Sequence, residues 1–193
     1  MKQMFAALAL GSVFVGVPAF ADAEVGKPAP AFTLKDESGK EHSLSQYKGK
    51  VVVLEWTNPE CPFVKRHYEA DTMANTLKGF DAKKVVWLAV DSTAHNTPDK
   101  SADWKKKEGI SYPVLQDASG ATGKAYGAKT TPHMYVIDAE GVVRYAGAID
   151  DDPRGKNAKK VNHVQTAVDA VLNGQPVPAS TTTPYGCSVK YKS

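Results

Sequence analysis

The stretch from Val51 to Lys65 reads VVVLEWTNPECPFVK, and it carries a cysteine between a predicted strand and a predicted helix. Its first four residues form a continuous apolar run, which is typical of a strand buried on both faces. Pro62 follows Cys61 directly and suits the first turn of a helix. Because the unpaired backbone N–H groups at a helix start carry positive partial charge, they favour a thiolate there. The stretch therefore predicts a reactive Cys61 at the start of a helix.

Charged residues surround this cysteine in the sequence. Lys65, Arg66 and His67 lie in the first two turns of the predicted helix, and their positive charge is expected to lower the pKa of the Cys61 thiol. Glu55 and Glu60 are candidates for a proton relay, although a solvated Glu60 is an equally good interpretation. The alternative for Cys61 itself is an inert structural cysteine.

The apolar pattern around this stretch predicts an α/β domain. Residues 85–90 and 134–137 are further short apolar runs that predict buried strands. A Glu140-Gly141 turn leads into residues 142–149, which are expected to pair with residues 134–138 as a hairpin. Helices ended by glycines are predicted over residues 61–77, 101–107 (with Ser101 as the N-cap), 119–127 and 161–172. This alternation predicts a central sheet with parallel strands and helices on both faces.

The composition fits one globular domain and excludes several classes of protein. Of 193 residues, 42% are hydrophobic and 23% are charged, which excludes wholesale disorder and a multi-span membrane protein. A net charge of +3 is too small to suggest a nucleic-acid partner, since clustered charge supplies most of that affinity. With two cysteines, at most one disulfide can form within the chain.

Residues 1–21, MKQMFAALALGSVFVGVPAFA, have the pattern of a secretory signal peptide. Lys2 precedes an apolar run from Met4 to Val17, and Ala19-Phe20-Ala21 resembles a cleavage site. The run is shorter than the roughly 20 residues that span a bilayer, so no stable membrane anchor is expected after cleavage. The mature protein is therefore predicted to be exported into an oxidising compartment, with the periplasm as the best candidate.

A proline marks the entrance to the predicted strand at 134–137. Pro132 follows Thr130-Thr131 and precedes His133. Proline suits the first residue of a strand or a bend, because it cannot donate a hydrogen bond inside a sheet. A cis peptide bond between Thr131 and Pro132 would fit this position, and an ordinary trans loop proline is the alternative.

Taken together, these motifs resemble the thioredoxin superfamily, specifically the redoxin branch related to alkyl hydroperoxide reductase and thiol-specific antioxidant proteins. The resemblance covers residues 23–174. It rests on Trp56…Cys61-Pro62, on Tyr126-Gly127…Thr131-Pro132, on Tyr135-Val136-Ile137-Asp138 and on Gly141…Gly147. It implies a thioredoxin-like fold, a central mixed sheet flanked by helices. It also implies that Cys61 is the attacking cysteine and that Thr131 and Pro132 line a substrate groove. Trp56, Pro62 and His133 are further candidate groove residues.

The chain departs from two motifs of this superfamily. Val64 occupies the place of the second cysteine in the Cys-x-x-Cys of thioredoxins, so no disulfide can form within the motif. In the Pro-x-x-x-Thr/Ser-x-x-Cys of peroxiredoxins, Leu54 takes the proline position and Asn58 takes the hydroxyl position. Peroxiredoxins also carry an arginine just before the strand that begins here with Thr131-Pro132, and no arginine stands there in this chain. Arg66 and Arg144 are the candidate substitutes.

The second cysteine, Cys187, lies in a tail that is distinct from the domain at residues 22–174. Residues 175–186 contain three prolines and a threonine run, which predict an extended tail over residues 175–193. The chain from Gly174 to Cys187 can span up to about 43 Å, so Cys187 can reach Cys61 from almost any exit point. We hypothesise that Cys61 attacks an oxidised substrate and that Cys187 resolves the intermediate. A permanent structural disulfide is the alternative.

Three functions follow from these alternatives. The leading interpretation is an exported thiol-disulfide oxidoreductase that acts on a protein disulfide and is reduced by a thiol electron donor. The second is a two-cysteine peroxidase, for which the substrate is a peroxide. The third is a non-enzymatic binding protein for copper or a protein partner, with Cys61 and His133 as the candidate copper ligands. No bound cofactor and no metal site are expected for the first two.

Overall fold

The computed structural model describes residues 22–192, so the predicted signal peptide lies outside the described residues. Seven strands form one sheet, with the bounds β1 (Thr33–Asp36), β2 (Glu41–Ser43), β3 (Val51–Thr57), β4 (Val85–Asp91), β5 (Val114–Gln116), β7 (His133–Ile137) and β8 (Val143–Gly147). The helices are α1 (Pro62–Glu69), α2 (Thr72–Lys78), α3 (Pro98–Glu108), α4 (Ala121–Tyr126), α5 (His163–Leu172) and the 3₁₀ helix η1 (Leu44–Tyr47). A second sheet pairs β6 (Thr130–Thr131) with β9 (Cys187–Ser188).

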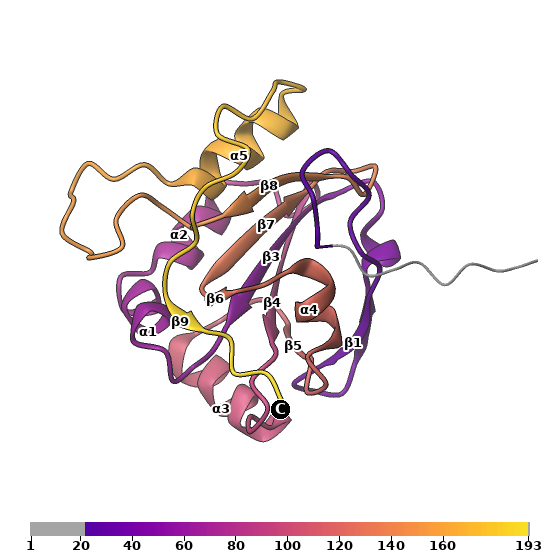
Figure 1. The fold of residues 1–193 in the computed structure, drawn as a ribbon, viewed down its shortest axis with the longest axis vertical. Helices are drawn as coiled ribbons and strands as arrows, with labels where there is room; N and C mark the ends of the chain where they lie inside the picture. Colours follow the sequence, from indigo (N-terminus) through magenta and orange to yellow (C-terminus); the bar gives the residue numbers. More distant parts are fainter. Residues whose placement is uncertain (1–21, 193) are drawn as a thin grey trace, which may run out of the picture.

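The seven-stranded sheet is mixed, with the order β2-β1-β5-β4-β3-β7-β8. Its centre, β3, β4 and β5, is parallel, as expected for strands joined by helical crossovers. β7 runs antiparallel to β3, and β8 pairs antiparallel with β7 as the predicted hairpin. The prediction of an α/β fold with a central mixed sheet flanked by helices is confirmed (Figure 1).

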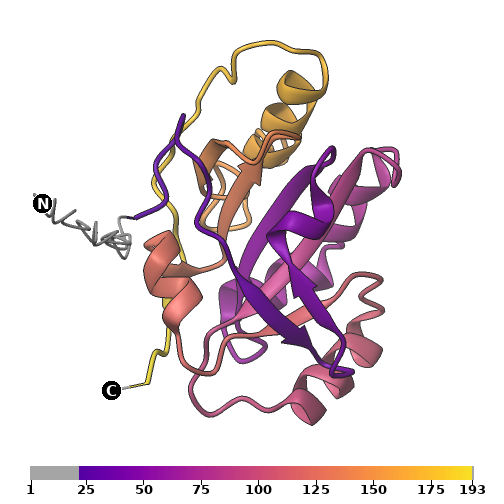
Figure 2. The ribbon, with the colours of Figure 1, turned by 90° about the vertical axis from the view of Figure 1, so that its right-hand side faces the viewer.

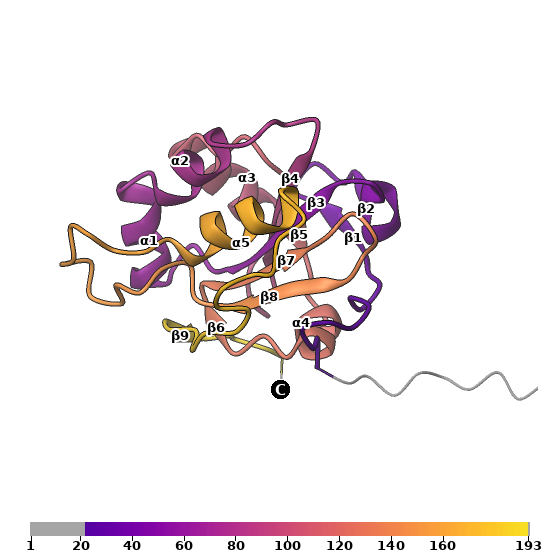
Figure 3. The same cartoon turned by 90° about the horizontal axis from the view of Figure 1, so that it is seen from above.

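The side chains of β3 alternate between two hydrophobic cores. Val51 and Val53 point toward the core that carries α1, α2, α3 and α5, while Val52, Leu54 and Trp56 point toward the core that carries α4. Figure 3 shows this division, with α4 on the opposite side of the sheet from α1, α2, α3 and α5. All seven residues of β3 are buried, which explains the continuous apolar run in the sequence.

Two predicted helix boundaries were wrong. The helix predicted over residues 61–77 is divided into α1 and α2, because Asp71 between them adopts a left-handed conformation (φ 52°) that no helix can continue. The helix predicted at 101–107 begins earlier, at Pro98. Thr97 is its N-cap and its side chain accepts a hydrogen bond from the backbone of Lys100. Ser101 is instead a fully buried residue inside α3.

The C-terminal tail contains no helix between Gly174 and Lys192 and lies along the domain as an extended strap (Figures 1 and 2). Its backbone bonds to β8 through Ala146 and Ser180, and its β9 segment pairs antiparallel with β6. Within the described residues, no helix has the length and apolar character needed to cross a membrane.

Candidate active site

Cys61 occupies the N-cap of α1, at the carboxyl end of the buried strand β3. Its backbone is extended (φ −72°, ψ 124°), and Pro62 takes the first helical position, as the sequence predicts. The turn between strand and helix is closed by a hydrogen bond from the Cys61 N–H to the carbonyl of Asn58, at 3.0 Å. Only 2% of Cys61 is exposed.

The tail brings Cys187 directly onto Cys61. In the antiparallel pairing of β6 with β9, Cys187 lies opposite Thr131. The two sulfur atoms are 2.8 Å apart, and the Cys61 Sγ also lies 3.0 Å from the carbonyl oxygen of Thr131. Both cysteines are free thiols in this structure, and Cys187 is the more exposed of the two. The two candidate catalytic residues of the sequence analysis therefore meet at one point.

The loop opposite Cys61 has the conformation that the sequence suggested. The peptide bond between Thr131 and Pro132 is cis. Gly186 lies against this loop with φ at +139°, and a Cβ there would collide with the Thr131 carbonyl. Since only glycine combines this backbone with so close an approach, Gly186 allows Cys187 to reach the loop.

The two thiols differ in acidity. Burial raises the pKa of the Cys61 thiol. Hydrogen bonds from Cys187, from the Thr131 hydroxyl and from the backbone N–H groups of Val64 and Cys187 stabilise its thiolate, and the net effect lowers its pKa. The pKa of Cys187 rises to about 11, because burial, its hydrogen bond with Cys61 and the negative charge of Cys61 all oppose its ionisation. Cys61 is therefore the thiol that ionises first.

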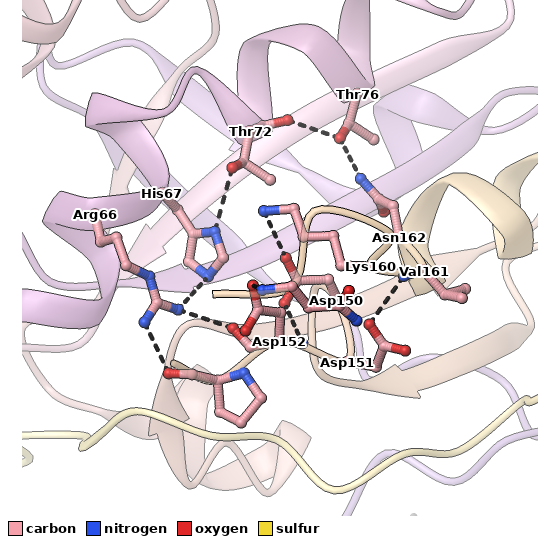
Figure 4. Close-up of polar contacts among 12 residues, drawn as sticks. Arg66, His67, Thr72, Thr76, Asp150, Asp151, Asp152, Lys160, Val161 and Asn162 are labelled. Carbon is pink, nitrogen blue, oxygen red and sulfur yellow. Dashed lines mark hydrogen bonds and ion pairs between the residues drawn. The ribbon is translucent and has the colours of Figure 1, made fainter. Parts of the chain in front are cut away.

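Two of the three basic residues after Cys61 have other partners (Figure 4). The Arg66 guanidinium donates to the carbonyls of Pro153 (2.7 Å) and Asp152 (3.3 Å) in the loop after β8. Burial lowers the pKa of His67 to about 4, so this ring is neutral at neutral pH. Contrary to the prediction, Arg66 and His67 are not among the main causes of the lowered pKa of Cys61, which are hydrogen bonds.

Glu55 lies on the same face of β3 as the core that contains Cys61, and it is fully buried. Its carboxylate accepts hydrogen bonds from Trp87 Nε1 (2.9 Å) and from the hydroxyls of Tyr68 (3.0 Å) and Tyr112 (3.3 Å). Burial outweighs these bonds and raises its pKa to about 7. No hydrogen bond joins Glu55 to Cys61 in the part of the chain that is described. Glu60 is an exposed side chain 3.0 Å from His95.

Trp56 and His133 lie on the other face of the sheet, away from Cys61 and from the other candidate groove residues. Trp56 is fully buried in the core on the α4 side, where its Nε1 donates to the Ser92 hydroxyl. The His133 ring packs against Tyr135 of the same core, tilted by 37° at a centroid distance of 4.6 Å, and burial lowers its pKa to about 4. The reason is the alternation of side chains along a strand, which directs both residues to the face opposite Cys61. Thr131 does lie beside both cysteines, and Pro62 and Pro132 directly follow Cys61 and Thr131 in the chain.

The residues considered for a copper or a peroxide site have the following surroundings in the described part of the chain. Among residues 22–192, no group of three or more His, Cys, Asp or Glu side chains could hold a metal ion. Arg144, a candidate substitute for the peroxiredoxin arginine, pairs with Asp138 on the surface of the β7–β8 hairpin. The Asn58 side chain accepts a hydrogen bond from the backbone of Glu60 and shapes the turn before Cys61.

The residues that hold the tail in place were not predicted from the sequence. Tyr185 contacts His67 and Asp150, and Tyr191 packs onto the first turn of α4. Their signal in the sequence is weak: two tyrosines that flank Cys187 in an otherwise polar tail. Asp150 is the first of three consecutive aspartates, Asp150-Asp151-Asp152, in the loop after β8.

Comparison with known proteins identifies the family. The AhpC/TSA family matches residues 25–146. A candidate peroxiredoxin of Mycobacterium tuberculosis is 30% identical over 149 residues, which cover 72% of this chain and 88% of that protein. The thiol-disulfide oxidoreductase ResA of Bacillus subtilis is 31% identical over 137 residues, 68% of this chain and 70% of ResA. The crystal structure of a hypothetical protein from Sinorhizobium meliloti matches with a TM-score of 0.77 and 29% identity, covering 90% of this chain and 97% of that one. The chain belongs to the AhpC/TSA family, and it is a thiol-dependent oxidoreductase with a thioredoxin-like fold.

Proposed function

We propose that this chain is a thiol-disulfide oxidoreductase in which Cys61 attacks an oxidised substrate and Cys187 resolves the intermediate. The observation that carries the proposal is the 2.8 Å separation of two sulfur atoms that are 126 residues apart in sequence. The order of their acidities supports the assignment of roles. A lowered pKa suits Cys61 as the nucleophile, and a raised pKa keeps Cys187 protonated until its turn.

The reaction is a pair of thiol–disulfide exchanges. The Cys61 thiolate attacks one sulfur of a substrate disulfide, so a Cys61–substrate disulfide forms and the other substrate sulfur leaves as a thiolate. Cys187 then releases its proton to solvent and attacks the Sγ of Cys61. The Cys61–Cys187 disulfide forms, and the second substrate sulfur leaves as a thiolate. The substrate gains two electrons, the cysteine pair loses two, and an external thiol donor restores the pair by the reverse exchanges.

Substrate entry requires the tail to move. Thr131 and Pro132, the proposed wall of the groove, are buried beneath the docked tail, and Cys61 itself is 2% exposed. The docked arrangement therefore corresponds to the resolving step, in which Cys187 must reach Cys61. The attacking step needs an arrangement in which the tail has left the groove.

A peroxidase remains the second candidate, because a relative named as a candidate peroxiredoxin is covered over 88% of its length. Peroxide would convert Cys61 to a sulfenic acid, and Cys187 would then displace water to form the same disulfide. Three features favour the disulfide substrate. Asn58 replaces the motif hydroxyl, Arg66 is bound to loop carbonyls, and Arg144 is paired with Asp138.

We also propose that the mature chain works outside the cytoplasm, in the periplasm. The support is the signal-like pattern of residues 1–21, and an oxidising compartment is where protein disulfides persist as substrates. Mass spectrometry of the chain recovered from an expressing bacterium tests this. An N-terminus at Asp22 in the periplasmic fraction is expected, and an intact Met1 in the cytosol contradicts export.

Two serine variants test the mechanism against a peptide disulfide, with dithiothreitol as the electron donor. Cys61→Ser is expected to abolish turnover. Without dithiothreitol, the pre-reduced Cys187→Ser chain is expected to stop at the mixed disulfide, seen as a substrate half bound to Cys61 in the mass spectrum, whereas the pre-reduced wild type is expected to release both substrate halves. The wild type and both variants are also assayed with hydrogen peroxide. If the wild type turns over peroxide faster than the peptide disulfide, the peroxidase is selected.

Two results would overturn the proposal. Full turnover by the Cys61→Ser chain removes Cys61 as the nucleophile. A Cys61–substrate disulfide that persists in the wild type without dithiothreitol, as it does in the Cys187→Ser chain, removes Cys187 as the resolving thiol. If neither variant changes any redox assay, the third interpretation, a binding protein with a structural cysteine pair, stands instead.

A further inference from the structure

Two tyrosines bracket Cys187 in the tail and contact opposite parts of the domain. Tyr185 precedes Cys187 by two residues and contacts α1 and the loop after β8. Tyr191 follows Cys187 by four residues and contacts α4 and the segment that follows it. The tail passes between these contacts over the cis-proline loop, where β9 pairs with β6.

The Tyr185 hydroxyl ends a chain of buried polar groups. It donates to Oδ1 of Asp150, and its oxygen lies 3.0 Å from Nε2 of His67. The other ring nitrogen of His67 lies 3.3 Å from the Thr72 hydroxyl. With the tail docked, Asp150 and His67 are each 1% exposed, so the Tyr185 hydroxyl bonds to them away from solvent. A hydrogen bond to a buried carboxylate is among the stronger contacts that a tail can make.

The Tyr191 ring fills a slot made by two glycines. A Cβ added to Gly123 would lie 2.5 Å from the Tyr191 hydroxyl, and a Cβ added to Gly120 would lie 2.6 Å from a ring carbon. The hydroxyl donates to the carbonyl of Ala128 at 2.8 Å. Glycine inside a helix is destabilising, so Gly123 in the middle of the short helix α4 indicates a need for this close approach.

We propose that Tyr185 and Tyr191 are positioning residues, which anchor the tail on both sides of Cys187 and thereby hold its thiol against Cys61. This inference rests on the proposed function. The anchors act on the resolving step, in which the Cys187 thiolate attacks Cys61 Sγ, the intramolecular disulfide forms and the substrate sulfur leaves as a thiolate. By keeping the tail docked, they also shield Cys61. Each catalytic cycle therefore opens and closes the same two contacts.

The first measurement is the rate at which a bulky maleimide alkylates Cys61, made in the Cys187→Ser chain so that only one thiol reacts. Because Cys61 is 2% exposed when the tail is docked, the rate reports how often the tail opens. Tyr185→Phe removes only the hydroxyl, and Tyr191→Ala empties the glycine slot. Each variant is expected to increase the alkylation rate of Cys61 about tenfold. This is the effect expected when the docked tail loses one hydrogen bond to a charged group, or the packing of one tyrosine ring.

The matched control is Tyr47→Phe, which also removes a partly buried hydroxyl, one that contacts the His42 ring far from the tail. It is expected to leave the alkylation rate at the value of the Cys187→Ser parent. An equal acceleration in the control and in the anchor variants would mean that alkylation follows global unfolding, and would overturn the inference. So would an unchanged rate in both anchor variants.

The second measurement separates this inference from the proposed function. With Cys187 present, Cys61 is loaded with glutathione as a mixed disulfide, and the release of glutathione by Cys187 is followed. The double variant Tyr185→Phe/Tyr191→Ala is expected to release it more slowly than the wild type by at least tenfold. If the wild type releases none, the resolving role of Cys187 fails, whatever the alkylation rates. If the wild type and the double variant release it equally fast, only the anchoring role fails.

Discussion

At the scale of single residues, the acidity of Cys61 depends on donors that come from distant parts of the chain. The backbone of α1 contributes one N–H, Thr131 contributes a hydroxyl, and Cys187 contributes its thiol and its own N–H. Burial acts in the opposite direction, since it penalises the charged thiolate. The reactive cysteine is therefore a property of the assembled site rather than of the Cys-Pro dipeptide alone.

The buried carboxyl of Glu55 leads to a prediction about pH. Its pKa rises from 4.5 to about 7 on folding, so the folded chain binds a proton that the unfolded chain releases. Its protonated form stabilises the fold fully below pH 4.5, and this contribution is lost as the pH rises to 7. We expect the free energy of unfolding to fall by up to about 3 kcal/mol across this range.

Urea unfolding at several pH values measures this loss, with Glu55→Gln as the comparison. The variant cannot ionise, so the difference in stability between variant and wild type is expected to grow from pH 4.5 to 7 and to level off above it. A difference that does not change with pH would show that folding does not raise the pKa of Glu55.

Residue-scale features were predictable where the cause is local. Cys61 at a helix start and Pro132 at a strand start follow from neighbouring residues, and both are found there. The partners of Glu55 were not predictable, because they come from α1, β4 and the segment before β5. Trp56 and His133 were assigned to the groove from their nearness in sequence, whereas strand alternation turns them to the other face.

At the scale of elements, continuous apolar strands were predicted and short polar ones were not. β3, β4 and β7 are buried on both faces, so their residues form apolar runs. β1 and β2 form an edge hairpin whose residues are half exposed, and β5 has only three residues. Periodicity carries little information in such segments, since they are shorter than the window that it needs.

In the helix α4, the contact of Gly123 with Tyr191 opposes the usual preference of a helix for alanine over glycine. Alanine normally stabilises a helix interior relative to glycine by about 1 kcal/mol. At Gly123 the added Cβ would instead meet the Tyr191 hydroxyl at 2.5 Å. We expect Gly123→Ala to displace Tyr191 and to accelerate the alkylation of Cys61 in the Cys187→Ser chain.

The control for this prediction is a double variant. In a chain that already carries Tyr191→Ala, adding Gly123→Ala is expected to give no further acceleration of alkylation, because the anchor is already lost. If Gly123→Ala and Tyr191→Ala increase the alkylation rate independently, so that their effects multiply, the two residues do not share one contact.

At the scale of the whole molecule, the tail connects the α5 end of the domain with α4 on the other side of the sheet. It follows α5, crosses the end of β8, pairs with β6 and reaches α4 (Figures 1 and 2). Its extended form was predicted from its prolines and threonines. Its path was not, since the contacts of Tyr185 and Tyr191 lie with residues more than 30 positions away in sequence.

Oxidation of the pair is expected to stabilise the entire domain. A Cys61–Cys187 disulfide closes a loop of 126 residues, which is worth about 5 kcal/mol in the chain-entropy treatment. Unfolding in urea, compared between the reduced and the oxidised protein, measures this gain. The Cys187→Ser chain, treated with the same oxidant, is expected to show none. Equal stability of the reduced and oxidised wild-type chains would mean that the intramolecular bond does not form.

The central claim, a cysteine pair that cycles between thiol and disulfide, is tested most directly by the reduction potential of the Cys61–Cys187 disulfide in glutathione or dithiothreitol buffers. The lowered pKa of Cys61 stabilises the reduced form, so we predict a potential in the range of catalytic dithiols, between about −120 and −270 mV. A potential below about −300 mV would contradict the account, because thiol donors could not reopen such a bond and the pair would serve only as a structural link.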